Sequence, residues 1–140
     1  MMDYFKMAEE KLYSVGTLRL KLKNYEAAYD KEIRRTAPSG IATIDLTKPA
    51  IMSSHTVDTF DSTDRIAHYK SKIIQTREEI KDITSIAEQL PKEMYNIIRL
   101  WYFEEKPKEI IMKLLYINST KTLYSKRNKA VRMFADIFPW

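Results

Sequence analysis

Apolar residues recur every three or four positions over two long stretches of this chain, the spacing that gathers side chains on one face of an α-helix. The stretches cover residues 2–35 and 62–89, and the second keeps a heptad pattern for over three repeats. Two such helices are expected to pair antiparallel, within the chain or across a dimer. The two stripes consist of Phe5, Ala8, Leu12, Val15, Leu18, Leu22, Tyr25, Tyr29 and Ile33, and of Ile66, Tyr69, Ile73, Thr76, Ile80, Ile83, Ala87 and Leu90.

The segment between these stretches, residues 36–60, carries no clear helical pattern. Pro38, Gly40 and Pro49 oppose helix within it, so we expect an irregular linker.

The last part of the chain, residues 91–140, predicts three short helices. Pro91 and Pro107 suit the first turn of a helix, and Ser119 or Thr120 can cap the last one. The expected inward-facing residues are Met94, Ile97, Ile98, Trp101 and Tyr102 in the first helix, and Ile110, Ile111, Leu114 and Leu115 in the second. The fold class predicted is therefore all-α: a long N-terminal helical hairpin over residues 1–90, followed by a three-helix, helix-turn-helix domain over residues 91–140.

The composition agrees with a folded protein. Of 140 residues, 44% are hydrophobic and 31% charged, which argues against global disorder. There is no cysteine, which excludes disulfides and thiolate metal sites, and no apolar run of about 20 residues that could cross a membrane. The start of the chain does not resemble a secretory signal, so we expect a cytoplasmic protein of a bacterial cell, associated with the nucleoid and not with a membrane.

Positive charge is concentrated in residues 106–135. This segment holds eight Lys or Arg and one Glu, a charge of +7, whereas the whole chain carries +5. Such a concentration on one small helical unit is typical of a polyanion partner, although a merely solvated helix face remains the alternative.

The predicted last helix, about residues 119–135, is basic on one side and apolar on the other. With 100° per residue, Ala130, Phe134 and Ile137 fall on the side of Leu123. Polar and basic residues fall on or beside the opposite face, where side chains could reach base edges and phosphates in a DNA major groove. The predicted DNA-binding residues are Ser119, Thr120, Lys121, Thr122, Ser125, Lys126, Asn128, Lys129 and Arg132. Lys126 and Arg127 flank the buried side, from which their long side chains could extend to phosphates.

The stretch LPKEMYNIIRLWYFEEKPKEIIMKLLYINSTKTLYSKRNKAVRMF resembles region 4 of the sigma-70 factors. Together with YFKMAEEKLY and IDLTKPAIMSSHTVDT, it makes the whole chain resemble the phage late transcriptional regulators of the ArpU and RinA type. The resemblance implies a phage or prophage regulator of late genes for packaging and lysis. It also places Lys121, Thr122, Ser125, Lys126 and Lys129 on a recognition helix, braced by the helix with Glu109, Ile110 and Leu114.

The corner between the last two helices departs from that family, because it has no glycine between Leu115 and Asn118. A left-handed residue is common at such a corner, and Asn118 is the expected substitute.

Other functions have weaker support. The two histidines, His55 and His68, lie 13 residues apart, one in the expected linker and one on an expected helix, so we expect no enzyme and no catalytic residue. Asp58, Asp61 and Asp64 lack the glycine and terminal glutamate of a calcium loop, so neither a metal nor a cofactor is expected. The partners expected are double-stranded DNA, host RNA polymerase and a second copy of the chain. The alternative function is a helical adaptor that binds RNA polymerase or acts in phage DNA packaging.

Overall fold

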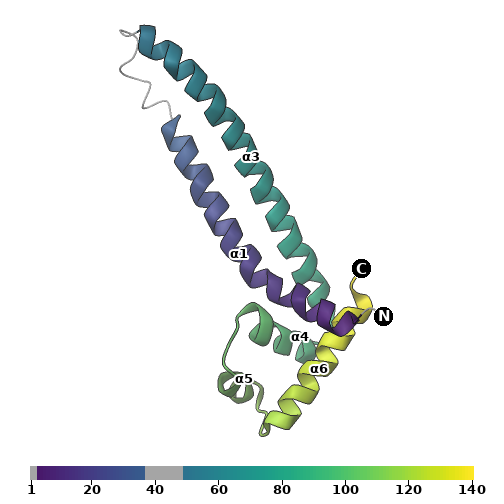
Figure 1. Ribbon diagram of the computed structural model, residues 1–140. Helices are drawn as coiled ribbons and strands as arrows, with labels where there is room; N and C mark the ends of the chain where they lie inside the picture. Colours follow the sequence, from purple (N-terminus) through teal and green to yellow (C-terminus); the bar gives the residue numbers. More distant parts are fainter. Residues whose placement is uncertain (1–2, 37–48) are drawn as a thin grey trace. The chain divides into compact units, whose positions relative to one another are not determined.

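A computed structural model describes the backbone of residues 3–36 and 49–140, and the side chains of residues 3–36 and 62–140. Every regular element in these ranges is a helix, which confirms the all-α prediction (Figure 1). Two long helices come first, α1 (Tyr4–Arg35) and α3 (Pro49–Ala87). Four shorter elements follow: α4 (Lys92–Ile98), a π-helical turn η2 (Arg99–Phe103), α5 (Lys108–Leu115) and α6 (Thr120–Ile137).

The predicted irregular linker at residues 36–60 is wrong in its second half, because α3 begins at Pro49. Proline opposes the interior of a helix, but its fixed φ and missing N–H are suited to the first position of one. The rest of the expected linker, residues 37–48, lies outside the described residues.

The chain forms two compact units, and their limits differ from the expected boundary after residue 90. Unit 1 contains residues 1–19 and 78–140, and unit 2 contains residues 20–77. Each long helix therefore belongs to both units. The start of α1 joins unit 1 because Ala8, Leu12 and Val15, all fully buried, share an apolar core with residues of η2 and α6.

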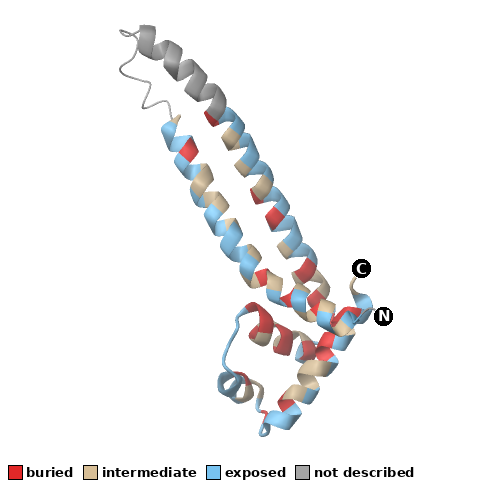
Figure 2. Ribbon diagram, in the orientation of Figure 1, coloured by how far each residue is buried: buried red, intermediate tan, exposed pale blue. Residues whose placement is uncertain are grey.

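That core contains the aromatic stretch of η2. As predicted, Tyr102 is buried, Trp101 packs against the cluster, and Met94, Ile97 and Ile98 of α4 are buried. Phe103 is buried as well. Buried residues line the facing sides of α4 and α6 (Figure 2). The prediction for α5 is wrong in part: Ile111 is buried, but Ile110 and Leu114 are 42% and 53% exposed. This short helix meets its neighbours along one narrow side only, where Ile111 packs with Leu100 and Leu123.

The corner between α5 and α6 turns at Tyr116, not at Asn118 as expected. Tyr116 ends α5 in the left-handed conformation, with φ 56° and ψ 41°. The N–H of Ile117 then donates to the carbonyl of Met112 at 2.9 Å, and Ile117 itself is buried beside Leu123. A left-handed residue directly after the helix closes the last turn, a geometry for which glycine is the usual choice.

We expect Tyr116→Gly to raise the free energy of unfolding by about 1 kcal/mol, because a side chain in the left-handed region costs about 1–2 kcal/mol and glycine gives part of this back as chain entropy. Tyr116 is 91% exposed, so no packing is removed. Urea denaturation of the full chain measures the change.

The matched control is Asn118→Gly. Asn118 is not among the positive-φ residues of the described chain, so glycine there should lower stability by about 0.5–1 kcal/mol. A gain at residue 118 and none at residue 116 would contradict the corner geometry.

Unit 2 brings together residues 20–35 of α1 and the part of α3 up to Arg77. Among the described residues, ion pairs join the helices from Arg77 to Glu26 at 2.7 Å and from Arg65 to Glu32 at 3.0 Å. The hydrogen bond from Arg65 keeps the pKa of Glu32 below its usual value, although burial of this carboxylate acts in the opposite direction. Ile33, which the sequence predicts to lie on the apolar stripe, is 39% exposed, and its neighbour Glu32 is buried.

Candidate nucleic-acid interface

Helix α6 is divided into a buried side and an exposed basic side. Leu123, Ala130 and Phe134 are fully buried, as predicted, but Ile137 is 44% exposed. Val131 and Ala135 are buried instead, in the same core as the first turns of α1. The buried side is thus rotated relative to the prediction, because the sequence pattern of α6 alone does not reveal that α1 packs in this core.

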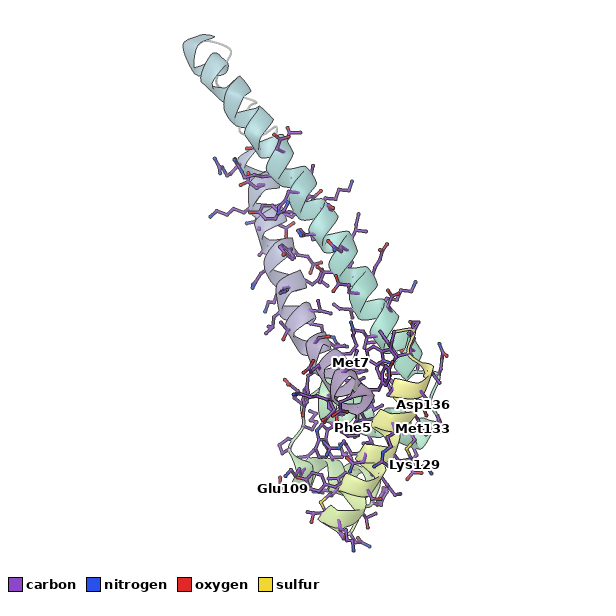
Figure 3. The ribbon with its side chains drawn as sticks, turned by 45° about the vertical axis from the view of Figure 1, so that its right-hand side comes forward. Phe5, Met7, Glu109, Lys129, Met133 and Asp136 are labelled. Carbon is purple, nitrogen blue, oxygen red and sulfur yellow. The ribbon has the colours of Figure 1, made fainter. Side chains whose placement is uncertain are left out.

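Most of the predicted DNA-binding residues lie on the exposed side or at the start of α6. Figure 3 shows Lys129 on this helix, and Arg132 lies about one turn further on. Exposed residues of the predicted set are Ser119, Thr120, Lys121, Thr122, Ser125, Lys129 and Arg132, whereas Lys126 and Asn128 are partly buried.

The start of α6 is fixed by Ser119. The side-chain oxygen of Ser119 accepts a hydrogen bond from the N–H of Thr122 at 3.1 Å, which confirms its predicted role as the N-cap. Thr120 and Lys121 follow in the first turn and are exposed. The helix start therefore presents hydroxyl groups and one ammonium group to solvent beside the partial positive charge of the helix dipole.

Two cations that the sequence predicts to reach phosphates also make contacts within the protein. Lys126 forms an ion pair with Glu93 of α4. The guanidinium of Arg127 lies over the rings of Trp101 and Tyr124, with centroid distances of 4.7 Å and 5.4 Å. These contacts leave Lys121, Lys129 and Arg132 as the α6 cations for which the described residues contain no ion-pair partner.

Arg127 belongs to a hydrogen-bonded cluster that the sequence did not reveal. Its Nη1 donates to Glu9 of α1 at 3.3 Å, and its Nε donates to the Asn128 side chain at 2.8 Å. The hydroxyl of Tyr102 donates to the same Glu9 carboxylate at 2.7 Å. Burial raises the pKa of the Tyr102 phenol, and this hydrogen bond raises it further. No periodicity links Glu9 to Arg127, since they lie at opposite ends of the chain.

More basic groups lie before and on α5. Lys106, Lys108 and Lys113 are exposed, and the ammonium of Lys108 lies 4.8 Å from the ring centroid of Tyr124 on α6. The only acidic residue among positions 106–135, Glu109, is on α5 and is exposed as well (Figure 3). The exposed surface of α5 and α6 therefore has a clear excess of positive charge.

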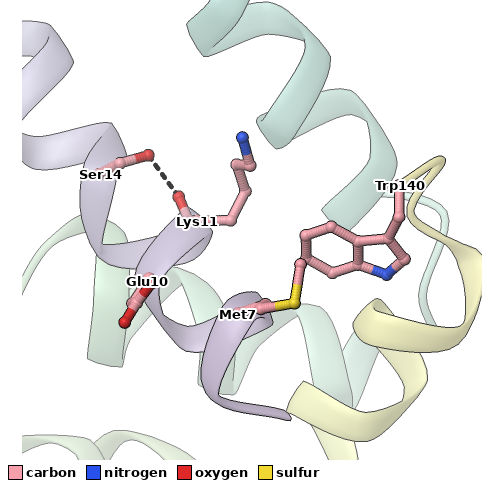
Figure 4. A pocket seen from close by; sticks show the side chains of 5 residues that line it. All are labelled: Met7, Glu10, Lys11, Ser14 and Trp140. Carbon is pink, nitrogen blue, oxygen red and sulfur yellow. Dashed lines mark hydrogen bonds between the residues drawn. The ribbon is translucent and has the colours of Figure 1, made fainter. Parts of the chain in front are cut away.

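A surface pocket of about 340 Å³ lies elsewhere in unit 1, between α1 and the C-terminal residue. Met7, Lys11 and Trp140 line it, together with Glu10 and Ser14 (Figure 4). The Trp140 indole donates to the carbonyl of Ala135 at 2.8 Å, and Ser14 donates to the carbonyl of Lys11 at 2.6 Å. Both of these hydrogen bonds are internal to the chain.

The described residues contain no group of acidic and histidine side chains arranged to hold a metal ion. Asp58 and Asp61 of the sequence triplet, and His55, lie outside the described side chains. His68 is exposed, with its ring edge against Tyr69. Within the part of the chain that the structure describes, no helix is long and apolar enough to span a bilayer.

The chain matches no model of a known protein family, and no curated protein or solved structure is significantly similar to it.

Proposed function

We propose that this protein binds double-stranded DNA through α6 and regulates transcription. The observation that carries the proposal is the exposed face of α6, where Lys121, Lys129 and Arg132 surround hydroxyl groups while the opposite side is anchored in the core. An α-helix fits the major groove, hydroxyl and amide groups can read base edges, and Lys and Arg bind phosphates.

In the proposed complex, α5 and α6 act as a helix-turn-helix and the start of α6 enters the groove. Lys121, Thr122 and Ser125 are then nearest to the bases, because the N-terminal residues of a recognition helix make most base contacts. Lys129 and Arg132 meet phosphates, as do the exposed lysines of α5. The resemblance to sigma-70 region 4 and to the ArpU and RinA regulators extends the proposal to activation of late phage or prophage genes.

The test replaces Lys121, Lys129 and Arg132 together by alanine. Binding of random-sequence duplex DNA should weaken at every salt concentration. The plot of log K against log salt should become less steep. Its negative slope should shrink in magnitude by about 2–3, at roughly 0.9 for each phosphate that the variant no longer neutralises. Fluorescence anisotropy at several salt concentrations measures both.

The matched control removes three exposed lysines of unit 2, Lys21, Lys23 and Lys31, and leaves α6 intact. It lowers the net charge by the same amount. Equal losses of affinity in the two variants would show a diffuse charge effect and contradict the α6 interface. A genome-wide footprint of bound sites would then supply the operator sequence.

One observation favours a protein partner as a second candidate function. Ile110, Leu114 and Tyr116 of α5 and its end are exposed apolar or aromatic residues in unit 1. Exposed apolar residues that gather on one element often mark a site of protein–protein contact. An adaptor that grips RNA polymerase or another regulator would use them, and DNA binding unchanged in the α6 triple variant would support this candidate.

A further inference from the structure

The described part of unit 2 buries few apolar side chains. Among its described side chains, residues 20–36 and 62–77, Ile73 is the one buried apolar residue. The others that are buried, Glu32, Ser62 and Thr76, are polar. Helices in proteins gain most of their stability from packing an apolar face, and association with another subunit is one way in which a small unit completes its core.

An open groove of about 440 Å³ runs along unit 2 where α1 and α3 meet. Tyr29, Ile73 and Ile74 supply its apolar surface, and Ile74 is 48% exposed. Ile33, one turn beyond Tyr29 on α1, adds a further exposed apolar side chain. The groove thus continues the heptad stripes but leaves part of them in contact with water.

Charges of opposite sign flank the groove. Its α1 side carries Glu26 and Asp30, and its α3 side carries Lys70 and Arg77. Glu26 and Arg77 pair with each other at 2.7 Å. Asp30 and Lys70 make no ion pair with any other described residue.

We propose that the groove of unit 2 binds the same groove of a second copy of this chain, forming a four-helix dimer. The charges select the arrangement. A twofold axis parallel to the helices places α1 of one copy over α3 of the other at the same height, so Asp30 faces Lys70 of the partner subunit. An axis across the helices would instead place the acidic side on the acidic side, and like charges repel.

The axis parallel to the helices also makes every neighbouring pair of helices antiparallel, the geometry of four-helix bundles. Ile33 and Ile74 of both copies are then removed from water. This inference does not rest on DNA binding, although a dimer would carry two copies of α6 and could read two half-sites.

The test measures the mass of the full chain in solution, without DNA, by analytical ultracentrifugation. The native chain should sediment at twice 16.6 kDa at micromolar concentration. Asp30→Lys and Lys70→Asp should each weaken the dimer at least about tenfold, because each variant places like charges opposite one another across the axis. An equimolar mixture of the two variants should restore association, since every lysine at these positions then faces an aspartate.

Lys31→Asp is the control, as this exposed residue lies about 100° around α1 from Asp30, on the side away from the groove. Circular dichroism confirms that each variant keeps its helix content. A native chain that stays monomeric at micromolar concentration would overturn the proposal. A dimer that ignores both charge reversals, or a mixture that does not reassociate, would overturn the groove-to-groove arrangement.

Discussion

Replacing Leu12 with alanine is expected to lower the free energy of unfolding of unit 1 by about 2–5 kcal/mol. Leu12 is fully buried in the core that also holds Tyr102 and Phe134. The large expected effect follows from the removal of three carbon atoms from a closely packed site that can collapse only in part. Urea denaturation followed by circular dichroism measures the loss of stability.

The control is Leu20→Ala on the same helix. Leu20 is 66% exposed, so the same chemical change should alter stability by less than about 0.5 kcal/mol. Equal effects at the two positions would contradict the assignment of the first turns of α1 to the core around α6. This comparison also tests the unit boundary, because a domain limited to residues 91–140 would not depend on Leu12.

Arginine-to-alanine substitutions at positions 127 and 132 should have opposite readouts. Arg127→Ala removes the ion pair with Glu9 and the contacts with two rings. The Arg127 side chain is only 16% exposed. We expect a loss of stability of about 2–4 kcal/mol, below the full value for a completely buried pair. Arg132→Ala changes an exposed residue, so stability should stay within about 0.5 kcal/mol while DNA affinity falls.

Denaturation and duplex binding at fixed salt, measured on both variants, separate the two roles. Arg127→Lys adds a second check, because lysine keeps the charge but not the planar group that stacks on Trp101 and donates to Glu9 and Asn128. Full stability in Arg127→Ala would show that the cluster does not brace α6.

The hydrogen-bonded cluster around Arg127 shows why the surroundings of α6 could be predicted only in part from the sequence. Spacing and charge identified the exposed face of α6, since that face depends on residues within one helix. The same reasoning did not reveal that Lys126 pairs with Glu93, because a helical wheel contains no information about a residue on another helix. Lys and Arg side chains can pair with acidic groups of the protein or bind phosphates of DNA. Only the neighbours of a side chain in three dimensions show which internal partners it has.

The corner shows a similar limit. Chemistry favoured Asn118 for the left-handed residue, because asparagine tolerates that conformation better than tyrosine. The structure places it at Tyr116, directly after the last turn of α5, so that Ile117 can reach the core beside Leu123. Burial of an isoleucine side chain contributes about 1.5–3 kcal/mol, which offsets the cost of about 1–2 kcal/mol for a left-handed residue.

The sequence alone determined what depends on neighbours along the chain: the all-α class, the two long helices, the helix starts at Pro91, Pro107 and Ser119, and the basic face of α6. The tertiary structure decided what depends on residues far apart. It placed the first turns of α1 in the core of unit 1, bound Lys126 and Arg127 internally, and left Ile74 exposed along unit 2. Helical periodicity shows which side of a helix is apolar but not which partner covers it. Many different apolar surfaces can pack against the same apolar stripe.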